Sequence, residues 1–593
     1  MGWTESPGKF AKGERWVWPD RAAALFLFLA TAAVVIWQNS RLAVLWDASY
    51  ILENSYRISL GELPYRDFPF PFAPGTFLVQ ALLIRLTGRA FFHHIIYCAV
   101  VGGLGTVLTW RILTNLLRGA LPSFRLLAFL LAVPLTVLGI YCIFPHPFYD
   151  PDCTLVILCC ILLLQQLERQ SFPPLRAFLA GIVFVVPLFV KQNTGLAFLV
   201  AAAIAVALQM PLEFRRRRPA SGYTWLLGGM AAGLGAAMLL LHFTVGLRNY
   251  AHWTIQFAAA RRLPRLSEML AYYHNPSLLI WIVAFSAGAV LHWRNKRGSR
   301  TLSFLSVLLM AVPFIWAVLY LFLEDDASGR AERLLALWPF LLIVSLFFAF
   351  WGTRQALGIT RILPFLLIAT VQGAFLSQQL WGSTYAIWPL LIILLGGILA
   401  DLYRLGRERS SREVTLLAGV AALSMLISGA FYVASHERLN YSDVSTGDIT
   451  RSSLTALKGL SMRGPWIPEF EELVNFAERK IPSDQGLLMI PGEDLFYYAT
   501  GRHPRFPVLM FDHTVNPYRP EQIVELARSR NICWLILKNR LQMNGELVEE
   551  KSRLLGLLRM DFSPVQSLAN YEIYRRSASS ICAGHPNSLS GTN

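Results

Sequence analysis

The sequence predicts a polytopic α-helical membrane protein that ends in a small α/β domain. Only 15% of its 593 residues are charged, whereas soluble proteins carry about a quarter. Apolar runs recur from residue 22 to about residue 435, and most approach the roughly 20 residues that cross a bilayer. After residue 437 the composition becomes that of an ordinary soluble chain.

The apolar runs predict about thirteen membrane spans. The first run follows Lys9, Lys12 and Arg15 but lacks a small-residue cleavage site, so we interpret it as a retained helix and not as a signal peptide. Segment 74–87 is too short for a span and fits an interfacial or re-entrant helix. The predicted spans are 20–38, 91–116, 124–142, 153–167, 175–190, 193–210, 223–246, 277–293, 303–323, 334–351, 361–378, 383–400 and 414–435.

Basic residues indicate the orientation of these spans. With the N-terminus in the cytoplasm, every basic cluster of the short connections falls on the cytoplasmic side, as the positive-inside rule requires. The clusters are Arg118 to Arg125, Arg169 to Arg176, Arg215 to Arg218, Arg294 to Arg300, Arg354 to Arg361 and Arg404 to Arg412. They also account for the net charge of +16, so we expect no nucleic-acid partner. Because the number of predicted spans is odd, the C-terminal domain is then expected on the outer side of the membrane.

The expected organisation is a membrane domain over 1–436, an α/β domain over 437–576 and a disordered tail over 577–593. Strand-like runs at 487–490, 508–511, 532–537 and 571–574 alternate with helical patterns at 468–480 and 520–530. The seven cysteines are odd in number and include no CxxC pair. This pattern predicts neither a disulfide framework nor a zinc site.

Acidic, aromatic and histidine residues gather in the outer connections, over 39–90, 143–152, 247–276 and 324–333. In the first of these, Asp47 begins a helix-compatible stretch, and Tyr50 follows on the same helical face. Arg66 and Asp67 come after a turn. Two interpretations of Asp47 stay open: a carboxylate that activates a hydroxyl group, or a helix cap.

The second outer connection carries His146, Tyr149, Asp150 and Asp152 just before a span. Two carboxylates this close are typical of a cation site or of a shared proton. They are equally typical of a helix N-terminus, where the dipole favours negative charge.

Basic residues at two further positions suit an anion. Lys191, with Gln192 and Asn193, lies between two apolar runs with almost no loop. A lysine there either anchors the interface or meets an anion such as a lipid phosphate. Arg330 and Arg333 follow an acidic run; they are either solvated or a second phosphate contact.

Several activities lack sequence support. The chain has no Walker-type phosphate loop, no HExxH and no GxSxG motif. Charges within the spans are few, which argues against an ion-coupled transporter.

The first outer loop resembles the GT-C membrane glycosyltransferases, in particular the family 39-type relatives of protein O-mannosyltransferase and lipid A aminoarabinose transferase. The matching segments are Asp47 to Tyr50, Gly61 to Phe68, Pro74-Gly75 and Arg85 to Gly88. The FYDPD and KQNTG segments follow in the same order. The resemblance covers residues 15–435 by layout and is specific in the first loop alone.

The resemblance implies a polyprenyl-phosphate-linked sugar donor and an envelope lipid, glycan or protein as acceptor. Asp47 takes the place of the catalytic base, and Asp150 that of the second acidic residue. No cofactor is expected with certainty; a divalent cation, if used, would bind Asp150 and Asp152. The expected substrate-binding residues are Tyr50, Arg66, Asp67, His146, Tyr149, Asp152, Lys191, Gln192, Asn193, Arg330 and Arg333.

Two departures from the family pattern matter. Many relatives have Asp-Glu where this chain has Trp46-Asp47, and some have a lysine where Phe68 follows Asp67. The phosphate contact is therefore expected from Lys191, Arg66 or Arg330. The alternatives are a lipid-linked glycan ligase or flippase-like transporter, and a non-catalytic scaffold of a polysaccharide system.

Overall fold

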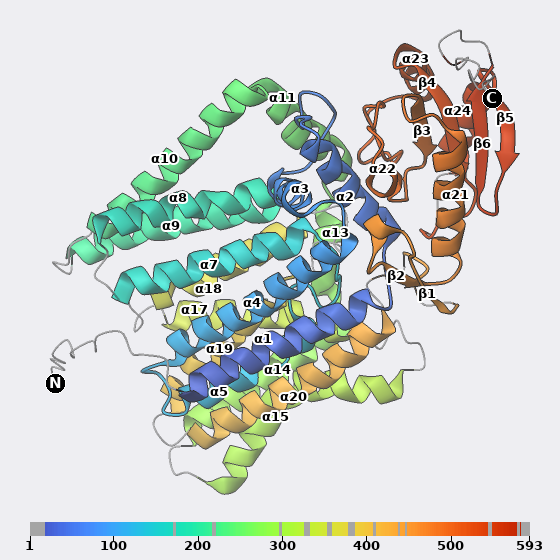
Figure 1. Ribbon diagram of the computed structural model, residues 1–593. Helices are drawn as coiled ribbons and strands as arrows, with labels where there is room; N and C mark the ends of the chain where they lie inside the picture. Colours follow the sequence, from blue (N-terminus) through green and yellow to red (C-terminus); the bar gives the residue numbers. More distant parts are fainter. Residues whose placement is uncertain are drawn as a thin grey trace.

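The computed structural model describes residues 18–169, 173–215, 221–295, 299–324, 333–352, 359–376, 386–406, 411–436, 439, 441–444, 447–543, 548–577 and 582. Long helices form a bundle, and a small sheet domain lies against one end of it (Figure 1). Helix α2 (Leu45–Ser59) lies between these two parts.

Ten helices in the described part of the chain are long and apolar enough to cross a membrane. They are α1 (Trp18–Asn39), α4 (Phe91–Leu117), α7 (Tyr149–Arg169), α9 (Gln192–Arg215), α10 (Ser221–Thr244), α14 (Pro276–Arg294), α15 (Arg300–Leu323), α17 (Leu337–Gly352), α19 (Trp388–Gly406) and α20 (Ser411–Ser435). Three apolar helices are shorter: α3 (Gly75–Thr87), α8 (Pro174–Val190) and α18 (Ile359–Phe375). The chain is therefore a multi-pass membrane protein, and α3 is the short helix expected over 74–87.

The predicted span 124–142 is not one helix. It is divided into α5 (Phe124–Ala132) and α6 (Leu135–Leu138). Pro134 lies between them and has no N–H group with which to continue the hydrogen-bond ladder of α5. Residues 139–148 then follow as buried turns, which bring His146 into the interior.

The connection between α10 and α14 is made of short helical pieces. They are α11 (Leu247–Ala251), a π-helix (His252–Phe257), α12 (Ala258–Arg262), α13 (Leu266–Leu270) and a 3₁₀ turn (Ala271–His274).

The C-terminal domain contains a mixed four-stranded sheet of order β3-β4-β6-β5. β3 pairs parallel with β4, and the other pairs are antiparallel. A separate hairpin joins β1 and β2. The elements are β1 (Ile449–Arg451), β2 (Ser461–Arg463), α21 (Trp466–Lys480), β3 (Gly486–Ile490), α22 (Phe496–Thr500), α23 (Pro520–Ser529), β4 (Ile532–Lys538), α24 (Val548–Arg559), β5 (Phe562–Ser567) and β6 (Tyr571–Arg576).

Two sequence-based strand assignments need correction. Residues 508–511 form no strand; Phe511 donates one backbone bond to the carbonyl of Pro491, and Pro507 has no N–H to donate. Strand β5 was not predicted from the sequence, because Pro564 interrupts it and five of its six residues are exposed. Both features are typical of an edge strand.

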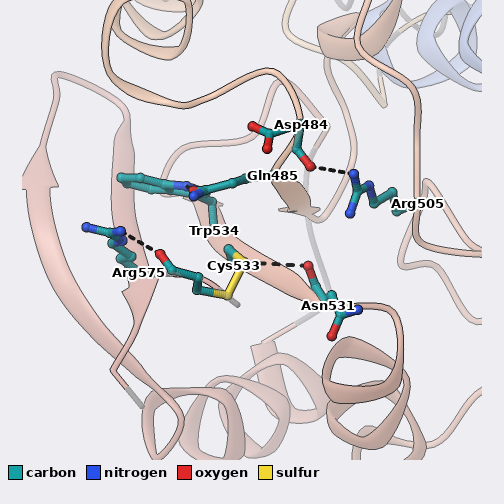
Figure 2. The surroundings of a disulfide bond; sticks show 8 residues. Asp484, Gln485, Arg505, Asn531, Cys533, Trp534 and Arg575 are labelled. Atoms are coloured by element: carbon teal, nitrogen blue, oxygen red, sulfur yellow. Dashed lines mark hydrogen bonds between the residues drawn. A yellow bond between two sulfur atoms is a disulfide. The ribbon is translucent and has the colours of Figure 1, made fainter. Parts of the chain in front are cut away.

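The expectation of no disulfide is wrong, since Cys533 of β4 is bonded to Cys582. Figure 2 shows this bond beside Trp534 and Arg575, and Arg575 donates to the carbonyl of Cys582 at 2.6 Å. The odd cysteine count and the separation of 49 residues concealed the pair. Cys582 is thus fixed to the sheet. Of the segment 577–593, predicted to be a disordered tail, the structure describes Ser577 and Cys582.

The polar contacts between the membrane part and the α/β domain are mainly hydrogen bonds from membrane-part side chains to backbone groups of the domain. From α2, Ser49 donates to the carbonyl of Gly492, Tyr56 to that of Gly501, and Arg57 to those of Phe506 and Pro507. Elsewhere, Arg89 donates to the carbonyls of Tyr498 and Ala499, and Arg261 to those of His513 and Asn516.

Glu53 lies in the middle of this interface and is fully enclosed. Its carboxylate accepts the backbone N–H of Tyr498 at 3.1 and 3.2 Å. Burial raises the pKa of Glu53 to about 8, because desolvation outweighs the hydrogen bonds that favour the charged form. Near neutral pH the folded protein therefore holds a proton that the unfolded chain releases.

We expect Glu53 to make stability fall as pH rises from about 5 to about 8, since the folded state binds more protons than the unfolded state in this window. The slope is at most about 1.4 kcal/mol per pH unit. Glu53→Gln should remove this slope and raise the unfolding temperature at pH 8. Exposed Glu525→Gln is the control. Thermal unfolding of the detergent-solubilised protein from pH 5 to pH 9 checks this, and identical pH profiles for wild type and Glu53→Gln would contradict it.

Candidate functional site

The N-terminus of α2 is fixed from two sides. Gln542 of the domain accepts the N–H of Leu45 at 2.7 Å and donates to the carbonyl of Ala43 at 2.8 Å. From the bundle, His146 Nε2 accepts the N–H of Val44 at 3.2 Å. These bonds give partners to backbone N–H groups at the start of α2, which have no acceptor within the helix.

Asp47 lies in the first turn of α2 and is half-buried. The hydroxyl of Tyr441, from the connection between α20 and the domain, donates to Asp47 Oδ2 at 2.5 Å. The positive end of the helix dipole stabilises a carboxylate at this position. Asp47 is therefore a positioned anion that keeps partial access to solvent.

His146 is buried among Phe91 and Phe144. Burial lowers the pKa of His146 to about 3, so the ring is neutral at physiological pH. Because Nε2 accepts the N–H of Val44, the ring proton is on Nδ1. His146 thus supports α2 through its acceptor nitrogen.

Asp150 forms an ion pair with Lys191. Both side chains are buried, with 4% and 6% of their surface exposed. The Lys191 ammonium also lies 5.5 Å from the ring centroid of Tyr149. The two residues come from separate connections, so the pair joins the start of α7 to the junction of α8 and α9.

Asp152 is held by hydroxyl groups and not by a cation partner. Its Oδ1 accepts from Tyr97 at 2.8 Å and from Tyr141 at 2.7 Å, and its Oδ2 accepts from Thr76 at 2.7 Å. The described residues contain no group of three potential metal ligands. Protein donors thus contact both Asp150 and Asp152, and the cation site expected at these two carboxylates stays a prediction.

The first outer loop closes over this group. Tyr50 lies 5.0 Å from Phe72, and Phe72 lies 5.3 Å from Tyr149, measured between ring centroids. Gln192 donates to the carbonyl of Pro71 at 2.9 Å and accepts the N–H of Ala73 at 3.1 Å. The aromatic rings therefore connect the helix of Asp47 with the Asp150–Lys191 pair.

Gly75 makes the close approach of the loop possible. A Cβ atom at this position would lie 2.7 Å from the backbone oxygen of Phe189, near the end of α8. Only glycine fits at that distance without a shift of the backbone.

Four expected site residues lie outside this group. Arg66 pairs with Asp67 at 2.8 Å, next to the turn after α2. Arg333 donates to the hydroxyl of Tyr320 at 2.7 Å, and Asn193 donates to the carbonyl of Leu376 at 2.9 Å. Arg330 lies outside the described residues.

Five residues that hydrogen-bond to Asp152, to Asp47 or to the start of α2 were not predicted from the sequence: Tyr97, Tyr141, Thr76, Tyr441 and Gln542. Tyrosines inside or beside apolar segments were a usable signal for Tyr97 and Tyr141, since a buried hydroxyl needs a partner. Nothing in the sequence connects Tyr441 or Gln542 with α2, because these contacts span 394 and 497 residues.

The domain has a buried charged cluster of its own. Lys538 lies 2.7 Å from Glu493 and 2.8 Å from Asp494, and Tyr571 donates to Asp494 at 3.0 Å. The cluster joins β4 and β6 to the turn after β3, which is a structural role.

No family model matches the chain, and no curated protein matches it. ArnT from Cupriavidus metallidurans bound to undecaprenyl phosphate aligns over 96% of this chain and 99% of its own, with 11% identity and a TM-score of 0.43. The Archaeoglobus fulgidus oligosaccharyltransferase in complex with Zn and sulfate aligns over 93% of this chain and 73% of its own, with 11% identity and a TM-score of 0.48. Both are GT-C fold membrane glycosyltransferases.

We expect the Asp150–Lys191 pair to be coupled in stability. Asp150→Asn leaves the buried ammonium without its ion-pair partner and should cost roughly 3–5 kcal/mol. Adding Lys191→Met should recover much of that loss, because the uncompensated charge is gone. Asp67→Asn, which breaks a more exposed pair, should cost about 1 kcal/mol or less. Thermal unfolding of the single and double variants measures the coupling, and additive effects would contradict it.

Proposed function

We propose that the chain is a membrane glycosyltransferase that moves a sugar from a polyprenyl-phosphate donor to a hydroxyl group of an envelope acceptor. One observation carries the proposal: the aromatic rings of Tyr50, Phe72 and Tyr149 connect the helix of the half-buried Asp47 carboxylate with the buried Asp150–Lys191 ion pair. The first-loop resemblance points to the same chemistry.

In the proposed reaction, Asp47 accepts the proton of the acceptor hydroxyl as its oxygen attacks the anomeric carbon. The bond from that carbon to the phosphate oxygen breaks, and polyprenyl phosphate leaves with the electron pair. A direct displacement of this kind inverts the anomeric centre.

Three further residues, Lys191, Asp150 and Tyr441, have supporting roles. Lys191 offers positive charge to the leaving phosphate, and Asp150 holds the ammonium in place. Tyr441 orients Asp47, so Asp150 and Tyr441 are positioning residues. The aromatic rings of Tyr50, Phe72 and Tyr149 supply surfaces against which a sugar can stack.

We also propose that the α/β domain lies on the extracytoplasmic side of a bacterial inner membrane. The basic clusters of the short connections support this orientation through the positive-inside rule. The Cys533–Cys582 bond supports it independently, because disulfides persist in oxidising compartments and are rare in the cytosol.

The orientation is tested with cysteines introduced at exposed Pro122, in the connection between α4 and α5, and at exposed His503 in the domain. A membrane-impermeant maleimide should label the His503 site in intact spheroplasts and the Pro122 site only after lysis. Labelling of both sites without lysis would overturn the orientation.

Asp47→Asn should reduce turnover by about a hundredfold or more while donor lipid still binds, because a general base acts in the transition state. Tyr441→Phe should lose roughly ten- to a hundredfold, since a hydrogen bond to a charged carboxylate contributes about 1.5–3 kcal/mol. Exposed Asp448→Asn, from the same connection as Tyr441, is the matched control.

Mass spectrometry of envelope glycans from cells with and without the gene identifies the product first. Turnover and donor binding are then measured for each variant and normalised to folded protein. Full turnover of folded Asp47→Asn would remove the base from this mechanism.

A further inference from the structure

A polar hollow of about 270 Å³ lies at the far end of α2 from Asp47. Its lining comes from the end of α2, the turn after it, the loop after α22 and the end of α23. The lining residues are Arg57, Glu62, Asp67, His503, Pro504, Arg505 and Arg530. The volume is just below the range of small-molecule sites, so the hollow suits one sugar-sized group and not a whole lipid-linked glycan.

Basic side chains outnumber acidic side chains in the lining of the hollow. Arg57 pairs with Glu62, and Arg66 neutralises Asp67. Within the described part of the chain, neither Arg505 nor Arg530 forms an ion pair with a carboxylate. Arg505 donates to the backbone carbonyl of Asp484 (Figure 2), an uncharged acceptor, so its guanidinium has no carboxylate partner among the described residues.

The hollow is also accessible and supported. Arg505 and Arg530 are exposed, and the side chain of His503, 3.4 Å from Glu62, is 59% exposed. Arg57 is buried and donates to the carbonyls of Phe506 and Pro507, so the wall is fixed to both parts of the protein. Guanidinium groups suit phosphate and carboxylate, and the carboxylates of Glu62 and Asp67 accept hydroxyl groups.

We propose that this hollow binds an anionic saccharide unit of the acceptor, with Arg505 and Arg530 on its phosphate or carboxylate. This assignment rests on the proposed function. Arg57 follows Asp47 by ten residues of α2, which places the two about 15 Å apart along the helix axis. The acceptor hydroxyl at Asp47 and the anionic unit are then held at opposite ends of one rigid element.

The test is calorimetric binding to the full-length protein in detergent at low ionic strength, where exposed charges are least screened. The probes are glucose 1-phosphate, inorganic phosphate and methyl glucoside. Glucose 1-phosphate should bind most tightly, and Arg505→Gln/Arg530→Gln should weaken its binding tenfold or more. Exposed Arg519→Gln, outside the hollow, is the matched control and should leave it unchanged.

The outcomes separate this site from the proposed reaction. Asp47→Asn should bind glucose 1-phosphate normally, since Asp47 does not line the hollow. If glucose 1-phosphate binds equally in wild type and in the double variant, the site is overturned whether or not sugar transfer occurs. Equal binding of inorganic phosphate and glucose 1-phosphate overturns the saccharide assignment. Loss of binding in the double variant of a protein that transfers no sugar supports the site and contradicts the proposed function alone.

Discussion

The burial of α2 between the bundle and the α/β domain is the constraint on which the rest of the site depends. A helix of 15 residues outside the spans has no membrane to hold it and is marginal alone in water. Its start is fixed by His146 and Gln542, and its later turns by Glu53 and Arg57. The position of Asp47 is therefore a property of the whole molecule and not of the first loop.

Hydropathy and charge predicted the parts of the fold that the bilayer imposes. Membrane spans must be long and apolar. This requirement identifies helices such as α4 and α20, and it also shows where the polar connections between the spans lie. The short helix α3 was predicted for the same reason. The break in 124–142 was not, because Pro134 is tolerated in many membrane helices, and only the surrounding contacts decide where the chain turns.

The candidate site could be predicted as a set of residues but not as a set of contacts. Lys191 was identified because charge beside a bilayer needs a reason, whereas the roles expected of Asp47 and Asp150 came from the resemblance of the first outer loop. That Asp150 holds Lys191 could not be read from the sequence, since a lipid phosphate would satisfy a lysine equally well. Arg66 and Asp67 share the first loop with Asp47, yet the turn after α2 places them at the other end of the helix.

The hydrogen bonds between the membrane part and the α/β domain have an evolutionary consequence, because side chains donate from one part and backbone carbonyls accept in the other. The membrane part contributes donor side chains such as Ser49, Arg57 and Arg89, whereas the acceptors in the domain are mostly main-chain carbonyls. A carbonyl is present whatever residue carries it. The domain surface can therefore drift in sequence while its docking geometry persists, so long as the path of its loops is kept. Paired substitutions should therefore be rare at these hydrogen bonds, and comparisons of related sequences would understate their share in joining the two parts.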